Sequence, residues 1–200
     1  SDVCSSDLYF SEYEEDGGFS KALESFSKLE LDANILQIEI EPSDTFWVKA
    51  SYNKPYLEPK VNVQNGKLEI RQSVKKSRGN NSAKLFIGIP VSENLLEIDA
   101  KVNVGEIDIS KIKCDSIKAK TDVGAIKIEN CLYSSLNVKT DVGEIRLSEP
   151  KDFSDFSVKC KTDIGEIRVL KNDYRHTFEQ SGNSKKKIDA RTNVGEISIK

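Results

Sequence analysis

The sequence predicts an all-β fold: a repeat β-solenoid or stacked β-repeat sandwich, parallel β-helix-like, with N-terminal antiparallel hairpins that cap the repeats. A motif such as Lys139-Thr-Asp-Val-Gly-Glu-Ile-Arg-Leu147 occurs five times, with its glycine at 105, 124, 143, 165 and 195. Apolar and polar residues alternate around each glycine, which is the period of a half-buried strand. Units of about 19 residues with this alternation are typical of stacked β-repeats. Upstream, Gln64-Asn65-Gly66 is typical of a tight hairpin turn.

We divide the 200 residues into a disordered or non-native leader, residues 1–18, and a single β-repeat domain, residues 19–200. Ser1 to Leu8 show no pattern that connects them with the rest of the chain. The chain contains no methionine, so residue 1 is not the translated start, and a signal sequence or a membrane anchor could precede it. Within the domain, residues 30–90 supply the N-terminal strands and cap, and residues 95–200 supply the five repeats.

Each repeat is expected to consist of a strand, a corner at the glycine and a second strand. The residue before the glycine, such as Val104, has inward parity, and the next inward residue comes three positions later, so the glycine turns the chain or forms a bulge. The Asn or Asp two positions before the glycine is expected to bond its own backbone in the turn. One column of threonines is expected to form a ladder: Thr121, Thr140, Thr162 and Thr192.

A polar insertion, residues 171–187, interrupts the last repeat, and we expect it to be a solvent-exposed loop. Tyr174, Arg175 and His176 make it a candidate binding loop, because exposed loops often carry recognition residues. The terminal strand, residues 196–200, ends without an obvious cap. Because an uncovered strand edge can pair with another chain, we expect weak self-association through this C-terminal edge.

Charged residues recur at fixed positions of the repeat and form a candidate partner-binding face. We expect the basic and acidic columns to flank each other as a mixed-sign lattice on one outer face, where each exposed pair contributes ~0–1 kcal/mol. The alternative is that the face is only solvated. The face comprises Lys120, Asp122, Lys139, Asp141, Lys161, Asp163, Arg146 and Arg168.

Composition argues against several function classes. The net charge of −3 does not favour nucleic-acid binding, which usually requires a basic excess. No apolar stretch approaches the roughly 18 residues of a membrane-spanning helix. With one histidine and no Cys-x-x-Cys spacing, we expect no metal site, no cofactor and no catalytic residues. The cysteines are expected to be buried thiols: Cys4, Cys114, Cys131 and Cys160.

The hairpins of residues 30–90, the strand Ile87-Gly-Ile-Pro90 and the recurrent Gly-x-Ile-x-Ile units resemble the bacterial adhesin-like, or toastrack, β-repeat domain family, a domain of unknown function. The resemblance covers roughly residues 30–200. It implies an extracellular or cell-envelope location, often with a membrane anchor upstream. It also implies a non-catalytic surface module whose partner is a protein or glycan of the cell envelope.

Two alternative functions remain. The domain could be a scaffold or sensory domain of a membrane-anchored envelope-stress signalling protein. It could also be a polysaccharide-acting β-helix enzyme that uses Asp122, Asp141 and Asp163 as paired acid and base. The second alternative is disfavoured because Asn103 and Asn193 fill the same column in other repeats, which indicates a backbone role rather than a catalytic one.

Overall fold

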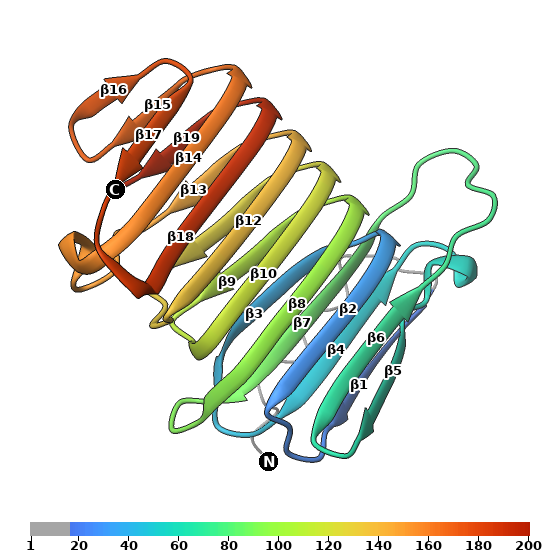
Figure 1. Ribbon diagram of the computed structural model, residues 1–200. Helices are drawn as coiled ribbons and strands as arrows, with labels where there is room; N and C mark the ends of the chain where they lie inside the picture. Colours follow the sequence, from blue (N-terminus) through green and yellow to red (C-terminus); the bar gives the residue numbers. More distant parts are fainter. Residues whose placement is uncertain (1–16) are drawn as a thin grey trace, which may run out of the picture.

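The protein consists of two facing β-sheets, and the computed structural model describes residues 17–200 (Figure 1). The predicted all-β class with stacked parallel repeats is confirmed. Sheet A has the strand order β1 (Gly17–Ala22), β4 (Trp47–Tyr52), β7 (Ala83–Pro90), β3 (Gln37–Ser43), β9 (Ile107–Ser110), β11 (Ile126–Glu129), β13 (Ile145–Leu147), β19 (Ile197–Ile199), β15 (Ile167–Val169) and β16 (Asn172–Tyr174). Sheet B has the order β17 (Thr177–Gln180), β14 (Phe156–Ile164), β18 (Asn183–Val194), β12 (Ser135–Val142), β10 (Lys113–Val123), β8 (Asn94–Val104), β2 (Lys28–Ile35), β6 (Lys67–Gln72) and β5 (Lys60–Gln64). Two single-turn 3₁₀ helices, Pro55–Leu57 and Phe153–Asp155, lie in the connections.

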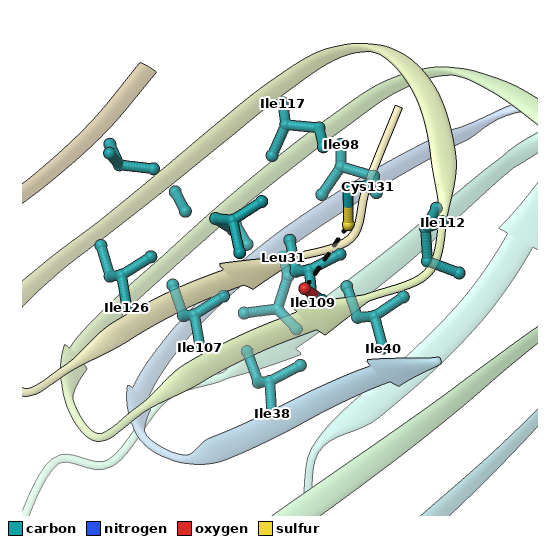
Figure 2. Packing of buried hydrophobic residues seen from close by; sticks show 14 of the residues in the cluster. Leu31, Ile38, Ile40, Ile98, Ile107, Ile109, Ile112, Ile117, Ile126 and Cys131 are labelled. Atoms are coloured by element: carbon teal, nitrogen blue, oxygen red, sulfur yellow. Dashed lines mark hydrogen bonds between the residues drawn. The ribbon is translucent and has the colours of Figure 1, made fainter. Parts of the chain in front are cut away.

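One rung of the stack is a strand in sheet B, a glycine corner and a short strand in sheet A. Neighbouring rungs pair in parallel and in register, so Ile117 lies beside Ile98 in sheet B and Ile126 lies beside Ile107 in sheet A. Figure 2 shows these four side chains pointing into the space between the sheets, where all are fully buried. Each such side chain contributes roughly 1.5–3 kcal/mol through its removal from water.

A sixth rung, formed by β2 and β3, precedes the five predicted ones. Its strands continue the repeat columns, with Leu29 beside Ile98 and Ile35 beside Val104. The motif is hard to recognise here because Leu36, a buried residue, occupies the position of the corner glycine. Leu36 is not among the residues with a positive φ angle, so its corner does not require glycine.

The other corners require glycine for two reasons. Gly105, Gly124, Gly143, Gly165 and Gly195 have φ angles between 144° and 153°, a region that side chains disfavour. The glycines also stack closely from rung to rung. A Cβ atom on Gly124 would lie 1.6 Å from the carbonyl oxygen of Gly105, and the same clash recurs along the column.

The spatial order of the last rungs differs from their order in the sequence. The final rung, β18 and β19, lies between the third repeat, β12 and β13, and the fourth, β14 and β15 (Figure 1). The predicted open C-terminal edge is therefore wrong, because β19 pairs in parallel with β13 on one side and with β15 on the other. Along the sequence, the fourth repeat comes before the final rung, but in space the final rung lies between the third and the fourth. Its strands therefore pair with the backbone hydrogen-bonding groups of both flanking rungs.

The insertion at residues 171–187 is not a loop, as the sequence had suggested, but a cap. Strand β16 pairs antiparallel with β15 in sheet A, and β17 pairs antiparallel with β14 in sheet B. Tyr174 and Phe178 pack against the end of the core with their ring centroids 4.8 Å apart. The insertion therefore closes the C-terminal end of the stack.

Antiparallel strands also cap the N-terminal end, as predicted. In sheet A, β4 pairs antiparallel with β7 and with β1, and in sheet B, β5 pairs antiparallel with β6. The predicted hairpin turn is present, with positive φ angles at Asn65 and Gly66. Because β1 begins at Gly17, the expected leader boundary at residue 18 is wrong by two residues. Residues 1–16 of that leader lie outside the described part.

The interior of the corners differs from the prediction in two respects. The residues before the glycines are not inward but half exposed, with 41–67% of their surface accessible. The threonines two positions earlier are the inward residues, and the predicted threonine ladder is confirmed: the Thr140 hydroxyl lies 2.8 Å from the Thr192 hydroxyl. Threonine, rather than Asn or Asp, bonds the corner, because the hydroxyls of Thr121, Thr140 and Thr192 donate to glycine carbonyls at 3.2–3.3 Å.

Candidate binding faces

The predicted mixed-sign lattice does not form a single face. Lys120 on β10 and Lys139 on β12 belong to sheet B, together with Lys161 on β14 and the three aspartates of the predicted face. Arg146 on β13 and Arg168 on β15 belong to sheet A, on the opposite side of the molecule. The error arose because the glycine corner turns the chain from one sheet to the other, so residues before and after it have separate surroundings.

The outer face of sheet B carries an unbroken row of five basic residues, which we call the basic row. Strand pairing places them side by side on five neighbouring strands, β8, β10, β12, β18 and β14. The row consists of the three lysines of the predicted face together with Lys101 and Arg191. All five occupy the same position of the repeat motif, so the sequence already indicates this column. In spatial order the row is Lys101, Lys120, Lys139, Arg191 and Lys161.

Within residues 17–200, one member of the basic row has an ion-pair partner. The Arg191 Nε atom lies 3.0 Å from the Asp189 Oδ1 atom. No carboxylate of the described chain lies within ion-pair distance of Lys101, Lys120, Lys139 or Lys161. The row is therefore a line of like charges in which, within residues 17–200, Arg191 alone is ion-paired.

Polar rows border the basic row on both sides. Two residues further along each strand is the column of the predicted catalytic alternative: Asn103, Asp122, Asp141, Asn193 and Asp163. Two residues earlier is a mixed column: Asp99, Lys118, Asn137, Asp189 and Lys159. A shallow hollow of about 250 Å³ lies between this mixed column and the basic row, and three lysines of the row line it.

The outer face of sheet A is, in contrast, internally paired. Arg168 forms two hydrogen bonds with the Asp173 carboxylate, at 2.6 and 2.9 Å, and Arg146 bonds Glu144 at 2.6 Å. Ser198 separates the two arginines in the strand register. A groove of about 310 Å³ lies over this region, and its charged side chains are of both signs. Charges of both signs therefore lie on both outer faces, and on sheet A the arginines of the predicted lattice are ion-paired.

Two carboxylates lie side by side on sheet A, Asp108 on β9 and Glu39 on β3. Burial, and then the charge of Glu129, raises the pKa of Asp108 above its ordinary value of 3.8. Burial, and then the charge of Asp108, raises the pKa of Glu39. Because the folded state binds these protons more tightly than the unfolded state, the folded protein loses stability as the pH rises from the ordinary values through the raised ones.

We therefore expect Asp108→Asn to raise the free energy of unfolding at pH 7, by less than about 1 kcal/mol because the site is partly exposed. The gain should vanish at a pH below 3.8, where the unfolded carboxyl is also protonated. Urea denaturation of both proteins at several pH values measures the difference. The exposed Asp152→Asn serves as a control, and a loss of stability in Asp108→Asn at pH 7 would contradict this account.

The candidate binding loop is part of the C-terminal cap. Tyr174 is half-buried against Phe178, whereas Arg175 and His176 are exposed in the turn between β16 and β17. The backbone N–H of Thr162 donates to the His176 carbonyl oxygen at 2.9 Å. Because the next residue, Thr177, pairs with Lys161, this turn adjoins the end of the basic row.

The cysteines of the described part are packing residues. Cys114, Cys131 and Cys160 are free and buried, and Cys4 lies outside the described residues. Burial raises the pKa of Cys131 to about 11 and that of Cys160 to about 12. The Cys131 thiol donates weakly to the Ile109 carbonyl oxygen, at 3.5 Å (Figure 2). Such thiols are poor nucleophiles, because the thiolate is the reactive form.

Residues 17–200 contain no group of three or more His, Cys, Asp or Glu side chains placed to hold a metal ion. They also contain no helix long and apolar enough to cross a membrane.

Comparison with known proteins places this architecture among solved folds. A candidate cell adhesion protein from Clostridium sporogenes has a TM-score of 0.70 and 20% identity to this chain, over 92% of this chain and 98% of that one. A candidate adhesin from Bacteroides fragilis has a TM-score of 0.46 and 15% identity, over 92% and 96% of the two chains. A search of curated proteins found no match. Residues 26–151, more than half of the sequence, match the family described as Toastrack DUF4097. With its glycine-cornered rungs and antiparallel caps, the chain belongs to the Toastrack DUF4097 family.

Proposed function

We propose that this chain is a non-catalytic binding module of the cell envelope or cell surface, and that the outer face of sheet B is its recognition surface. The observation that supports the proposal is the basic row, in which three neighbouring lysines, Lys101, Lys120 and Lys139, and a fourth, Lys161, beyond Arg191 have no ion-pair partner within residues 17–200. Like charges directly opposite each other destabilise a sheet. Since this row weakens the fold, we attribute it to recognition.

The shared fold with the candidate cell adhesion protein from Clostridium sporogenes supports the same proposal. That likeness concerns architecture, and we extend it to the setting: an extracellular or envelope-associated module that a neighbouring segment of the full protein anchors. In this proposal the rigid stack displays the face, and the caps keep its ends from pairing with other chains.

Binding of immobilised protein to purified envelope polymers tests the proposal. The panel contains peptidoglycan, neutral glycans, acidic polysaccharides and lipid vesicles. We expect saturable binding to at least one class, weakened by K120Q/K139Q and unchanged by K75Q/K76Q, which removes the same two charges from an exposed segment outside the row. Absence of saturable binding to every class would contradict a recognition module.

The same samples test the enzymatic alternative. Recovered polymers are analysed for chain length and for new reducing ends after long incubation. We expect unchanged lengths, because Asp122, Asp141 and Asp163 form one column on one face rather than two carboxylates facing each other across a bound sugar. Shortened polymer that disappears with Asp141→Asn would instead identify a hydrolase.

A further inference from the structure

The length and direction of the basic row define what can bind along it. The five side chains lie on neighbouring parallel strands, so the row runs across the strands and along the stack. With strands about 4.8 Å apart, five positions span about 19 Å. Both ends are bounded, because Asp32 pairs with Lys101 and Thr177 pairs with Lys161. A ligand that matches the row is linear and repeats its negative charge at about the spacing of the strands.

The width of the row restricts the ligand further. The neighbouring columns begin two residues away on each strand, or about 7 Å along it. One of them contains Asp122, Asp141 and Asp163, whose carboxylates repel a second line of negative charge. A double-stranded nucleic acid, with phosphates on both sides of a wide helix, would meet these carboxylates. A single narrow chain would not.

The flanking columns also favour one chemical class. Asn and Asp side chains offer oxygen atoms that accept hydrogen bonds from hydroxyl groups. A sugar chain carries hydroxyl groups along both edges, and an acidic sugar adds a carboxylate at each ring. A phosphodiester backbone offers mostly acceptors, which the aspartates cannot satisfy. The positive charges of the basic row and the hydrogen-bond acceptors of the adjoining Asn and Asp column therefore fit an acidic polysaccharide.

We propose that the basic row binds a single linear acidic polysaccharide with one negative charge on each sugar, laid along the stack across β8, β10, β12, β18 and β14. The inference rests on the proposed function, because it names the ligand class of the same face. Lys101, Lys120, Lys139 and Lys161 contact the acidic groups, and the adjoining Asn and Asp column accepts hydrogen bonds from the sugar hydroxyls. Arg191 contributes while it keeps its bond to Asp189.

Titration of the full chain with polygalacturonate tests the proposal, because its methyl ester has the same backbone without the charges. We expect saturable binding of the acid and none of the ester. K120Q/K139Q should weaken binding by about tenfold or more and reduce its dependence on salt concentration, whereas K75Q/K76Q should leave both unchanged. Equal weakening by the two double variants would indicate nonspecific charge attraction and overturn the proposal.

Oligomers of increasing length provide a second measurement. Affinity should rise with each added sugar and level off at about five sugars, the number of positions in the row. Duplex DNA at the same salt concentration should bind at least tenfold more weakly than the acidic polymer. The proposal would be overturned if duplex DNA bound more tightly than the acidic polymer. It would also be overturned if the affinity for the oligomers did not depend on their length.

Thermal unfolding of each variant without ligand separates a loss of binding from a loss of structure. Lys139 is exposed and Lys120 is half-buried at the surface, and their replacement by glutamine removes like-charge repulsion. K120Q/K139Q should therefore melt at the same temperature as the parent protein or a higher one. Saturable, row-dependent binding of a neutral glycan without binding of polygalacturonate would contradict this inference but agree with the proposed function. Absence of binding to every envelope polymer would contradict both.

Discussion

Gly124→Ala is expected to lower the free energy of unfolding by about 3 kcal/mol or more. Gly124 has a φ angle of 148°, and an added Cβ would lie 1.6 Å from the Gly105 carbonyl oxygen. The substitution thus forces a disfavoured backbone angle and pushes two rungs apart. Denaturation in urea, followed by circular dichroism, measures the loss.

Gly66→Ala is the matched control for this substitution. Gly66 also has a positive φ angle, 70°, but an added Cβ would meet only the Ser27 hydroxyl, at 4.0 Å. It should cost about 1 kcal/mol, the penalty of the left-handed conformation alone. If Gly124→Ala costs no more than Gly66→Ala, the close stacking of the glycine corners does not carry the stability that we assign to it.

Deletion of residues 183–200 is expected to unfold the C-terminal half of the stack rather than to shorten it by one rung. The deleted strands β18 and β19 lie between the third and fourth repeats, so β14 and β15, to which the cap strands β17 and β16 are paired, would lose their parallel partners. Hydrogen exchange with mass spectrometry should show loss of protection over residues 156–180 and retained protection over residues 94–129.

The outcome distinguishes two topologies. If the rungs were stacked in the order of the sequence, the deletion would remove an end rung, and residues 156–169 would remain protected against β12 and β13. Retained protection there would therefore contradict the strand order described here. The full-length chain provides the reference exchange rates for both segments.

The repeat motif predicts the paired strands of each rung and their register, because a two-residue period with one apolar face allows only one inward parity away from the corner. Ile98 and Ile117 illustrate this, since they align in the sequence and are neighbours in sheet B. The basic column of the candidate site is predictable for the same reason. The strand register converts each motif position into a row on the surface. The prediction of parity fails at the residue before each glycine, which is half exposed.

Features that depend on contacts between distant segments are not visible in the motif. The position of β18 beside β12 and β14 reflects which strand edges remain unpaired after the fourth repeat forms, and no local pattern encodes it. The strands of the C-terminal cap could not be predicted from the polar residues at 171–187, because short edge strands tolerate polar side chains on their outer face. The rung formed by β2 and β3 could not be recognised from the motif, because Leu36 occupies its corner and this corner does not need the backbone freedom of glycine.

Lysine footprinting tests the central claim most directly, since it locates the bound polymer on the surface. The protein is acetylated briefly with and without polygalacturonate, and each lysine is quantified by mass spectrometry. We expect the polymer to protect Lys101, Lys120, Lys139 and Lys161 and to leave Lys75 and Lys76 unchanged. Protection confined to sheet A or to the caps, or no protection at saturating polymer, would contradict recognition by the basic row.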